Sequence, residues 1–384
     1  MTATRAGRTR RTRTAALISV LLGCALAGAF RQTIGAHVRA VSLMLRLSND
    51  HGWLSRLADT PVVEENLLLR SEFGAFRARI YRPRDGRRAH GMILAHGVHY
   101  MGIDEPRLRP FARNLARTGL VVMTPELAAL ADYRVEASSV REIEVAVQHL
   151  ARDAHVESGG VTVMGLSFAG GLALLACADP TTRPHVSTVV ALGAHHDLAR
   201  VSRFLATDEL ETPQGVRHMR AHDYGLLVFF YANAGLFVEA AQAPIFRDVL
   251  RHMLHVDRAS ARRAAEHLVG DARVLYERIE HNDKPALAPL VLRVLPQLRA
   301  HAREVSPAGR IAGLAGLHVI LMHGAADDVM PPTEAIANAA ELSGRADVTL
   351  YVTPTIHHVT VEGPLTLRQR WQLVHVMAAV LSAG

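Results

Sequence analysis

Short apolar runs alternate with amphipathic segments along much of this chain. The apolar runs are rich in β-branched residues and cover residues 92–95, 120–124, 161–166 and 186–192. Between them, residues 107–117 and 139–152 place their apolar positions on one helical face. Strands without polar alternation are typical of a parallel sheet that is buried on both faces, with helices as connections. The pattern therefore predicts an α/β protein with a mostly parallel, doubly wound sheet.

The second of these helices has a predicted start. Ser139 is followed three residues later by Glu142, the spacing of a capping box, in which each side chain bonds to a backbone N–H at the helix end. We expect the helix to begin there.

Two segments depart from the alternation. Residues 65–71 and 75–82 predict an antiparallel hairpin, which ends at Pro83 because proline cannot donate to a strand ladder. Residues from about 199 to 310 are mainly helical and contain an aromatic cluster, and the strand pattern resumes at residues 318–322. We therefore predict one domain over residues 64–384, with a helical cap at about 199–310 inserted into the sheet topology.

The N-terminal segment has the pattern of an export signal. In residues 1–31, five arginines precede an apolar run of 16 residues that begins at Ala15, short for a membrane span. A cleaved signal peptide, a lipoprotein signal at Cys24 and an uncleaved signal anchor all fit. Each implies a protein that faces away from the cytoplasm, anchored in a membrane or secreted, with residues 32–63 as a juxtamembrane helical segment.

Composition narrows the function classes. The chain has 384 residues, 49% hydrophobic and 21% charged, as expected of a globular protein. Its net charge of +7 is concentrated in the first fourteen residues, and no basic stripe interleaved with aromatic residues follows, so we expect no nucleic-acid partner. The two cysteines, Cys24 and Cys177, form no disulfide framework.

A serine stands at the sharpest predicted turn of the chain. The sequence Gly165-Leu-Ser167-Phe-Ala-Gly170 follows the apolar run at 161–166 and precedes a segment of helix formers. A serine at a tight strand-to-helix turn, with small residues around it, is typical of a nucleophile elbow. An ordinary glycine-rich turn with an incidental serine fits the same six residues.

A nucleophilic serine needs a base to remove its proton and a carboxylate to orient that base. Asp327 and His358 each follow a predicted strand, and the carboxyl ends of parallel strands meet at one edge of a sheet. We therefore predict a triad of Ser167, Asp327 and His358. The alternatives at this stage are Asp328 or Asp197 as the acid, and His357 as the base.

These motifs resemble those of the α/β-hydrolases over residues 64–384. The segment 323–331 is similar to the family's His-Gly-x-x-Asp-x-x-x-Pro acid loop, and His96-Gly97-Val98 is similar to its His-Gly stretch after the third strand. The resemblance implies that the backbone N–H groups of Val98 and Phe168 form the oxyanion hole. Within the family the motifs resemble those of dienelactone-hydrolase-like and small esterase members, although dienelactone hydrolases have cysteine where this chain has Ser167.

The expected activity is that of a serine hydrolase that cleaves a carboxylic ester, with thioesters or lactones included, through an acyl-enzyme. The apolar cap and the export signal indicate a hydrophobic ester. We expect no organic cofactor and no metal, since the loop histidines (His99, His195, His196 and His323) lack a metal-binding spacing. The alternatives are an acyltransferase that uses the same acyl-enzyme and a non-catalytic binding module.

Overall fold

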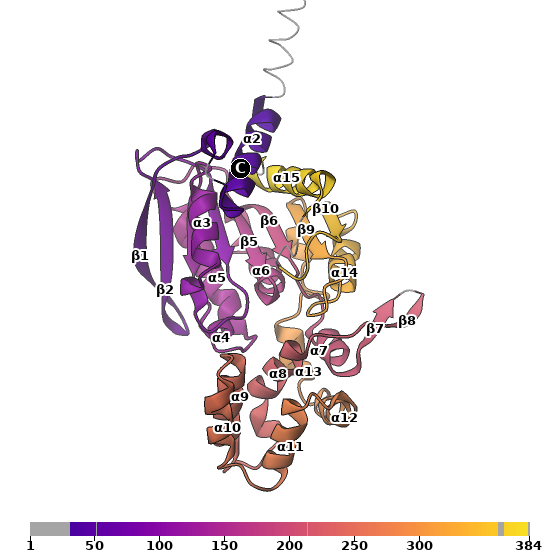
Figure 1. Cartoon of the computed structure of the whole chain (residues 1–384). Helices are drawn as coiled ribbons and strands as arrows, with labels where there is room; N and C mark the ends of the chain where they lie inside the picture. Colours follow the sequence, from indigo (N-terminus) through magenta and orange to yellow (C-terminus); the bar gives the residue numbers. More distant parts are fainter. Residues whose placement is uncertain (1–30, 51, 213, 360–364, 383–384) are drawn as a thin grey trace, which may run out of the picture.

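A computed structural model describes residues 31–50, 52–212, 214–359 and 365–382. Within them the central sheet has eight strands in the order β1-β2-β4-β3-β5-β6-β9-β10 (Figure 1). Their bounds are β1 Val62–Ser71, β2 Gly74–Pro83, β3 Gly91–Ala95, β4 Val121–Pro125, β5 Val161–Leu166, β6 Val186–Leu192, β9 His318–Gly324 and β10 Asp347–Thr353.

The predicted mostly parallel sheet is confirmed. β4, β3, β5, β6, β9 and β10 pair in parallel, whereas β2 pairs antiparallel with both β1 and β4. β1 and β2 are the predicted hairpin, and Ser71 pairs with Gly74 at its turn. The hairpin therefore forms one edge of the sheet, and the parallel strands form its centre and its other edge.

Both faces of the sheet are covered. In β3, Ile93 and Ala95 belong to one core cluster, and Met92 and Leu94 belong to another on the opposite face, all almost fully buried. This double burial explains why the strands lack polar alternation. The first face packs against α5 Ala137–Ala151, α6 Phe168–Ala178 and α14 Thr333–Leu342, and the second against α2 Arg31–Leu47, α3 Leu108–Ala116 and α15 Leu367–Ser382.

The segment that precedes the hairpin is docked on the domain. Ala36, Ala40 and Leu43 of α2 are buried in the second core cluster, and the Arg39 guanidinium donates to the carbonyl of Leu381 in α15 at 2.8 Å. A short 3₁₀ helix, η1 Trp53–Arg56, follows. The apolar run of the predicted export signal lies outside the described residues. Among those that are described, no helix is both long and apolar enough to cross a membrane.

A helical insertion separates β6 from β9, which are neighbours in the sheet. It has its own hydrophobic cluster, at the lower end of the molecule in Figure 1, and Phe230 of this cluster packs edge-on against Phe237 with ring centroids 4.7 Å apart. Its elements are α7 Leu198–Thr207, the hairpin β7 Glu209–Thr212 and β8 Gly215–His218, α8 Asp223–Ala232, η4 Ala234–Leu236, α9 Ala243–Leu254, α10 Arg258–Ala265, α11 Gly270–Glu280, α12 Lys284–Val294 and α13 Arg299–Glu304.

The remaining elements are short. They are η2 Gly102–Asp104, α4 Ala128–Ala131, η3 Arg183–His185 and η5 Ala312–Leu314.

The predicted capping box of α5 is wrong. The helix begins at Ala137, two residues before Ser139, and both Ser139 and Glu142 are buried within it. The Glu142 carboxylate instead accepts the backbone N–H of Ala128 in α4 at 3.2 Å. A tertiary contact therefore uses the side chain that the local pattern assigns to the cap.

We expect Glu142→Gln to stabilise the protein at alkaline pH. Burial raises the pKa of Glu142 to about 7, and the charges of Glu126 and Glu136 add to this increase. Between the unfolded value of about 4.3 and pH 7, the folded chain binds more protons than the unfolded chain, so stability falls as pH rises. Urea unfolding should show a gain of about 1–3 kcal/mol at pH 8.5 that largely disappears at pH 4.5.

Glu157, an exposed glutamate, supplies the control. Glu157→Gln should change the free energy of unfolding by less than about 0.5 kcal/mol at either pH. An equal gain for Glu142→Gln at both pH values would contradict the assigned protonation of Glu142.

Candidate active site

Ser167 occupies the strained turn between β5 and α6. Its backbone has φ 57° and ψ −131°, a conformation that L-residues rarely adopt and that is held here by the surrounding structure. A Cβ atom at Gly165 would lie 2.3 Å from the carbonyl oxygen of Ala169, so only glycine fits at that position. The Ser167 N–H donates to the carbonyl of Leu192 in β6 at 2.7 Å, which fixes the turn to the neighbouring strand.

Asp327, His358 and Ser167 form a continuous hydrogen-bonded chain. Asp327 lies in the loop after β9, and His358 lies in the loop after β10. His358 Nδ1 is 2.9 Å from Asp327 Oδ2, and His358 Nε2 is 2.9 Å from Ser167 Oγ. The structure thus brings together the three residues that the sequence selects, each from a loop at the carboxyl end of a parallel strand.

The Asp327 carboxylate is completely buried, and several hydrogen bonds compensate for its loss of water. Its Oδ1 accepts the N–H groups of Val329 at 3.0 Å and Met330 at 2.8 Å. Burial alone would raise its pKa, but hydrogen bonds from His323 and His358 outweigh burial and hold the pKa of Asp327 well below its usual range. Asp327 is therefore ionised at neutral pH and favours the tautomer of His358 with the proton on Nδ1.

His323 contacts the Asp327 carboxylate, a role that the sequence did not predict. Its Nε2 lies 2.7 Å from the carbonyl oxygen of Met330 and 3.3 Å from Asp327 Oδ2, so a proton on Nε2 faces both acceptors. The available signal was its place at the start of the acid loop, four residues before Asp327.

His96 orients the backbone of the expected oxyanion hole. Its Nε2 accepts the N–H of Leu127 at 2.9 Å, so its proton is on Nδ1, which donates to the carbonyl of Gly97 at 2.7 Å. Burial lowers the pKa of His96, which keeps the ring neutral. Because the peptide unit is planar and trans, the Val98 N–H points away from the anchored Gly97 carbonyl.

Each expected oxyanion donor belongs to a residue next to the serine turn: Phe168 follows Ser167 in the sequence, and Val98 follows Gly97, which packs against Ser167. Gly97 packs directly on the serine, since a Cβ atom there would be 3.2 Å from Ser167 Cβ, and Val98 is the next residue. Phe168 is the first residue of α6, where the backbone N–H has no partner within the helix. The partial positive charge of a helix N-terminus adds to the attraction for an anion at this position.

The alternative triad members have other contacts. Asp197 caps α7, where its Oδ1 accepts the N–H groups of Ala199 at 2.8 Å and Arg200 at 3.1 Å. Asp328 and His357 lie 3.9 Å apart as an ion pair when the histidine is charged. The hydrogen-bond partner of Ser167 Oγ is His358 Nε2.

The loop histidines are dispersed. His195 Nε2 bonds to the carbonyl of Val305 at 2.8 Å, His196 Nε2 bonds to Glu341 at 2.8 Å, and His99 stacks on Tyr100. Over the described ranges, no group of three or more His, Cys, Asp or Glu side chains is placed to hold a metal ion.

A cavity of about 210 Å³ lies between Phe168 and the helical insertion. Its wall is mainly apolar, and the apolar side chains that line it include Phe168, Leu205, Val228, Phe229, Leu295 and Leu298. Polar residues, among them Arg134, Glu136 and His301, also line it. Phe168, which directly follows Ser167 in the sequence, links this cavity to the turn after β5.

No protein-family model and no curated protein matches the chain. Among solved structures, it is similar to an esterase from Pyrobaculum calidifontis, with 18% identity, a TM-score of 0.47, and coverage of 91% of this chain and 92% of the esterase. Brefeldin A esterase, a bacterial homologue of human hormone-sensitive lipase, matches with 14% identity, a TM-score of 0.46, and coverage of 92% of this chain and 83% of its own.

A third match, the acylaminoacyl peptidase of Pyrococcus horikoshii, has 10% identity and a TM-score of 0.48 over 79% of this chain and 39% of the peptidase.

The fold class follows from this chain's own features. An antiparallel edge hairpin, six parallel strands, a serine at the turn after β5 and a helical insertion after β6 together give the arrangement that the sequence motifs imply. The chain has the α/β-hydrolase fold.

Proposed function

We propose that this protein is a serine hydrolase that cleaves a carboxylic ester through an acyl-enzyme. The observation that carries the proposal is the unbroken chain of hydrogen bonds from Asp327 through His358 to Ser167, which ends on a hydroxyl at a strained turn. A serine that stood in a glycine-rich turn by chance would not require a histidine on its hydroxyl or a carboxylate on that histidine.

Each residue has a role in the proposed reaction. Ser167 Oγ attacks the ester carbonyl while His358 Nε2 takes its proton, and His358 then returns the proton to the departing alkoxide. Asp327 holds the ring and stabilises the positive charge that develops on His358. The N–H groups of Val98 and Phe168 stabilise the negative oxygen of the tetrahedral intermediate, and water then releases the acid by the same steps.

The cavity beside Phe168 favours a substrate with an apolar group. A wall of aliphatic and aromatic side chains binds hydrocarbon better than a charged or strongly hydrated group, because burial of apolar surface is the main gain in free energy there. We therefore propose a hydrophobic ester as the substrate class. Thioesters and lactones remain within the proposal because they react through the same acyl-enzyme.

We further propose that the protein is exported and faces away from the cytoplasm. The support is the arginine-rich start of the chain followed by the apolar run from Ala15. Membrane association through this segment is part of the same proposal. Protease treatment of intact cells or spheroplasts should degrade the protein if it is exposed outside the cytoplasm.

Labelling by a fluorophosphonate probe tests the serine chemistry. The full-length protein should be labelled at a stoichiometry near one, because the probe reacts with a serine that a neighbouring base activates. Ser167→Ala should not be labelled, and Ser202→Ala, which changes a serine that lines the cavity, should be labelled like the wild type. If the intact, folded protein is not labelled, the proposed activity is wrong.

A further inference from the structure

A second cavity, of about 430 Å³, lies between the end of α2, the segment after it and α3. None of the elements that position Ser167, Asp327 and His358 contributes to it. Half of its ten lining residues are arginines, and a single one, Asp59, is acidic. The arginines are Arg46, Arg56, Arg109, Arg113 and Arg117.

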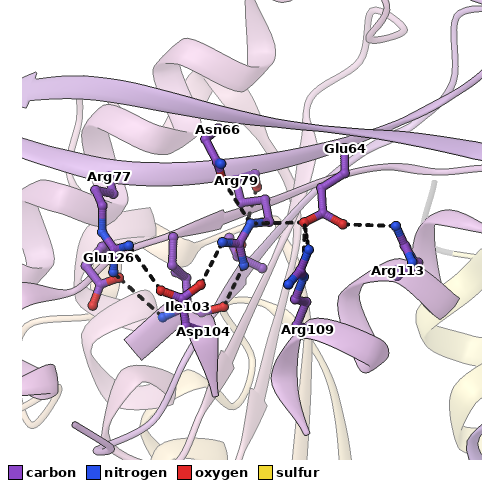
Figure 2. A network of polar contacts seen from close by, with 10 residues as sticks. Glu64, Asn66, Arg77, Arg79, Ile103, Asp104, Arg109, Arg113 and Glu126 are labelled. Atoms are coloured by element: carbon purple, nitrogen blue, oxygen red, sulfur yellow. Dashed lines mark hydrogen bonds and ion pairs between the residues drawn. The ribbon is translucent and has the colours of Figure 1, made fainter. Parts of the chain in front are cut away.

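The carboxylates nearby balance only part of this charge. Asp59 accepts both Nε and Nη2 of Arg117, at 2.6 and 2.5 Å. Glu64 in β1 is shared, because Arg109 lies 2.8 Å and Arg113 3.2 Å from its carboxylate, and the buried Arg79 lies 3.2 Å from it (Figure 2). The five lining arginines carry five positive charges, and Asp59 and Glu64 carry two negative charges, so three positive charges are in excess.

Arg46 is a buried cation that contacts no carboxylate in the described part of the chain. It is 6% exposed, and its Nη atoms donate to Ser42 Oγ and to backbone carbonyls, among them those of Ser55 and Asn114. Its Nε is buried without a hydrogen-bond partner. Burial lowers the pKa of Arg46, as expected when a guanidinium loses water without gaining a paired anion. An anion in the cavity would compensate this desolvation.

Exposed apolar side chains adjoin the cavity. Trp53, Leu54 and Leu57 are 73%, 39% and 53% exposed, and they flank the lining residues Ser55 and Arg56 in the sequence. Tryptophan and leucine beside arginines are typical of a surface that enters the interface of a membrane with anionic lipids.

We propose that this cavity binds a phosphate group through its arginines. Guanidinium groups match the geometry of phosphate oxygens and can bind them in pairs. The phosphate belongs to a phospholipid headgroup or to a soluble phosphate compound. The exposed Trp53, Leu54 and Leu57 favour the headgroup, which would place η1 in the membrane surface.

The test uses the full-length chain with Trp371→Phe, so that Trp53 is its only tryptophan. One arm adds vesicles of phosphatidylcholine with brominated phosphatidylglycerol, and the other titrates inorganic phosphate by calorimetry. Headgroup binding should quench the Trp53 emission, and Arg109→Gln/Arg113→Gln should remove at least half of that quenching. In the phosphate arm the same variant should weaken binding about tenfold or more, since two cations are lost.

Arg262→Gln/Arg273→Gln is the matched control, because it also removes two surface arginines that pair with glutamates. It should leave both readouts unchanged. Arginine-dependent quenching assigns the site to a lipid headgroup, and arginine-dependent phosphate binding without quenching assigns it to a soluble phosphate. If neither readout depends on Arg109 and Arg113, the proposal is wrong. Arg56→Gln, at an exposed position, repeats the test should the double variant fail to fold.

Discussion

The His358→Ala variant is expected to hydrolyse a simple ester such as p-nitrophenyl butyrate with a kcat about 10⁶-fold below that of the wild type. His358 Nε2 is 2.9 Å from Ser167 Oγ, so the substitution removes the group that we propose takes the serine proton. Loss of the base in a serine triad costs about as much as loss of all three members, because the serine hydroxyl is then a poor nucleophile. Initial rates at saturating substrate measure the effect.

His357→Ala is the matched control, since it removes an imidazole one residue away. His357 is paired with Asp328, and Ser167 Oγ is occupied by His358. We expect kcat within about threefold of the wild type for His357→Ala. If the losses were reversed between the two variants, the base assigned to this site would be wrong.

The strand positions were predictable because their physical cause is local in the sequence. Ile93 and Met92 face opposite sides of the sheet, and both are buried, so an unbroken apolar run of four residues was enough to mark β3. The β1–β2 hairpin was equally accessible, since a polar turn lies between two strand-like runs. The order of the strands in the sheet was not predicted, because apolar runs do not show which strands pair.

Contacts between distant segments were not predictable from local patterns. Ser139 and Glu142 have the spacing of a cap, but Glu142 bonds to Ala128 because α4 packs across the start of α5. The docking of α2 on α15 was missed for the same reason, since Arg39 and Leu381 are far apart in the chain.

In the candidate site, too, some residues could be predicted from the sequence and others could not. Ser167, Asp327 and His358 could be selected because each must follow a strand, which is a requirement of topology. The roles of His323 and His96, which contact Asp327 and Gly97, could not be predicted from the sequence. A buried histidine has the same sequence environment whether it hydrogen-bonds to a site residue or only fills space in the core. Only the distances to Asp327 and to Gly97 distinguish these roles.

The Asp327→Asn variant is expected to lower kcat about 10⁴-fold while leaving the fold intact. Asparagine has the same shape and can still accept the N–H groups of Val329 and Met330 through its oxygen. Its amide nitrogen then faces His358 Nδ1 and donates to it, so the imidazole carries its proton on Nε2 and can no longer accept one from Ser167. The ring stays in place with the wrong tautomer, and kcat falls more than KM changes.

Asp328→Asn separates this effect from a general loss of charge in the loop. It removes a carboxylate from the adjacent residue, whose partner is His357 and not His358. We expect kcat within about threefold of the wild type for Asp328→Asn, and both variants should unfold cooperatively in a thermal scan. Since the Asp327 carboxylate is buried and ionised, a folded Asp327→Asn variant with near wild-type kcat would mean that His358 needs no orienting anion, and the triad mechanism would have to be abandoned.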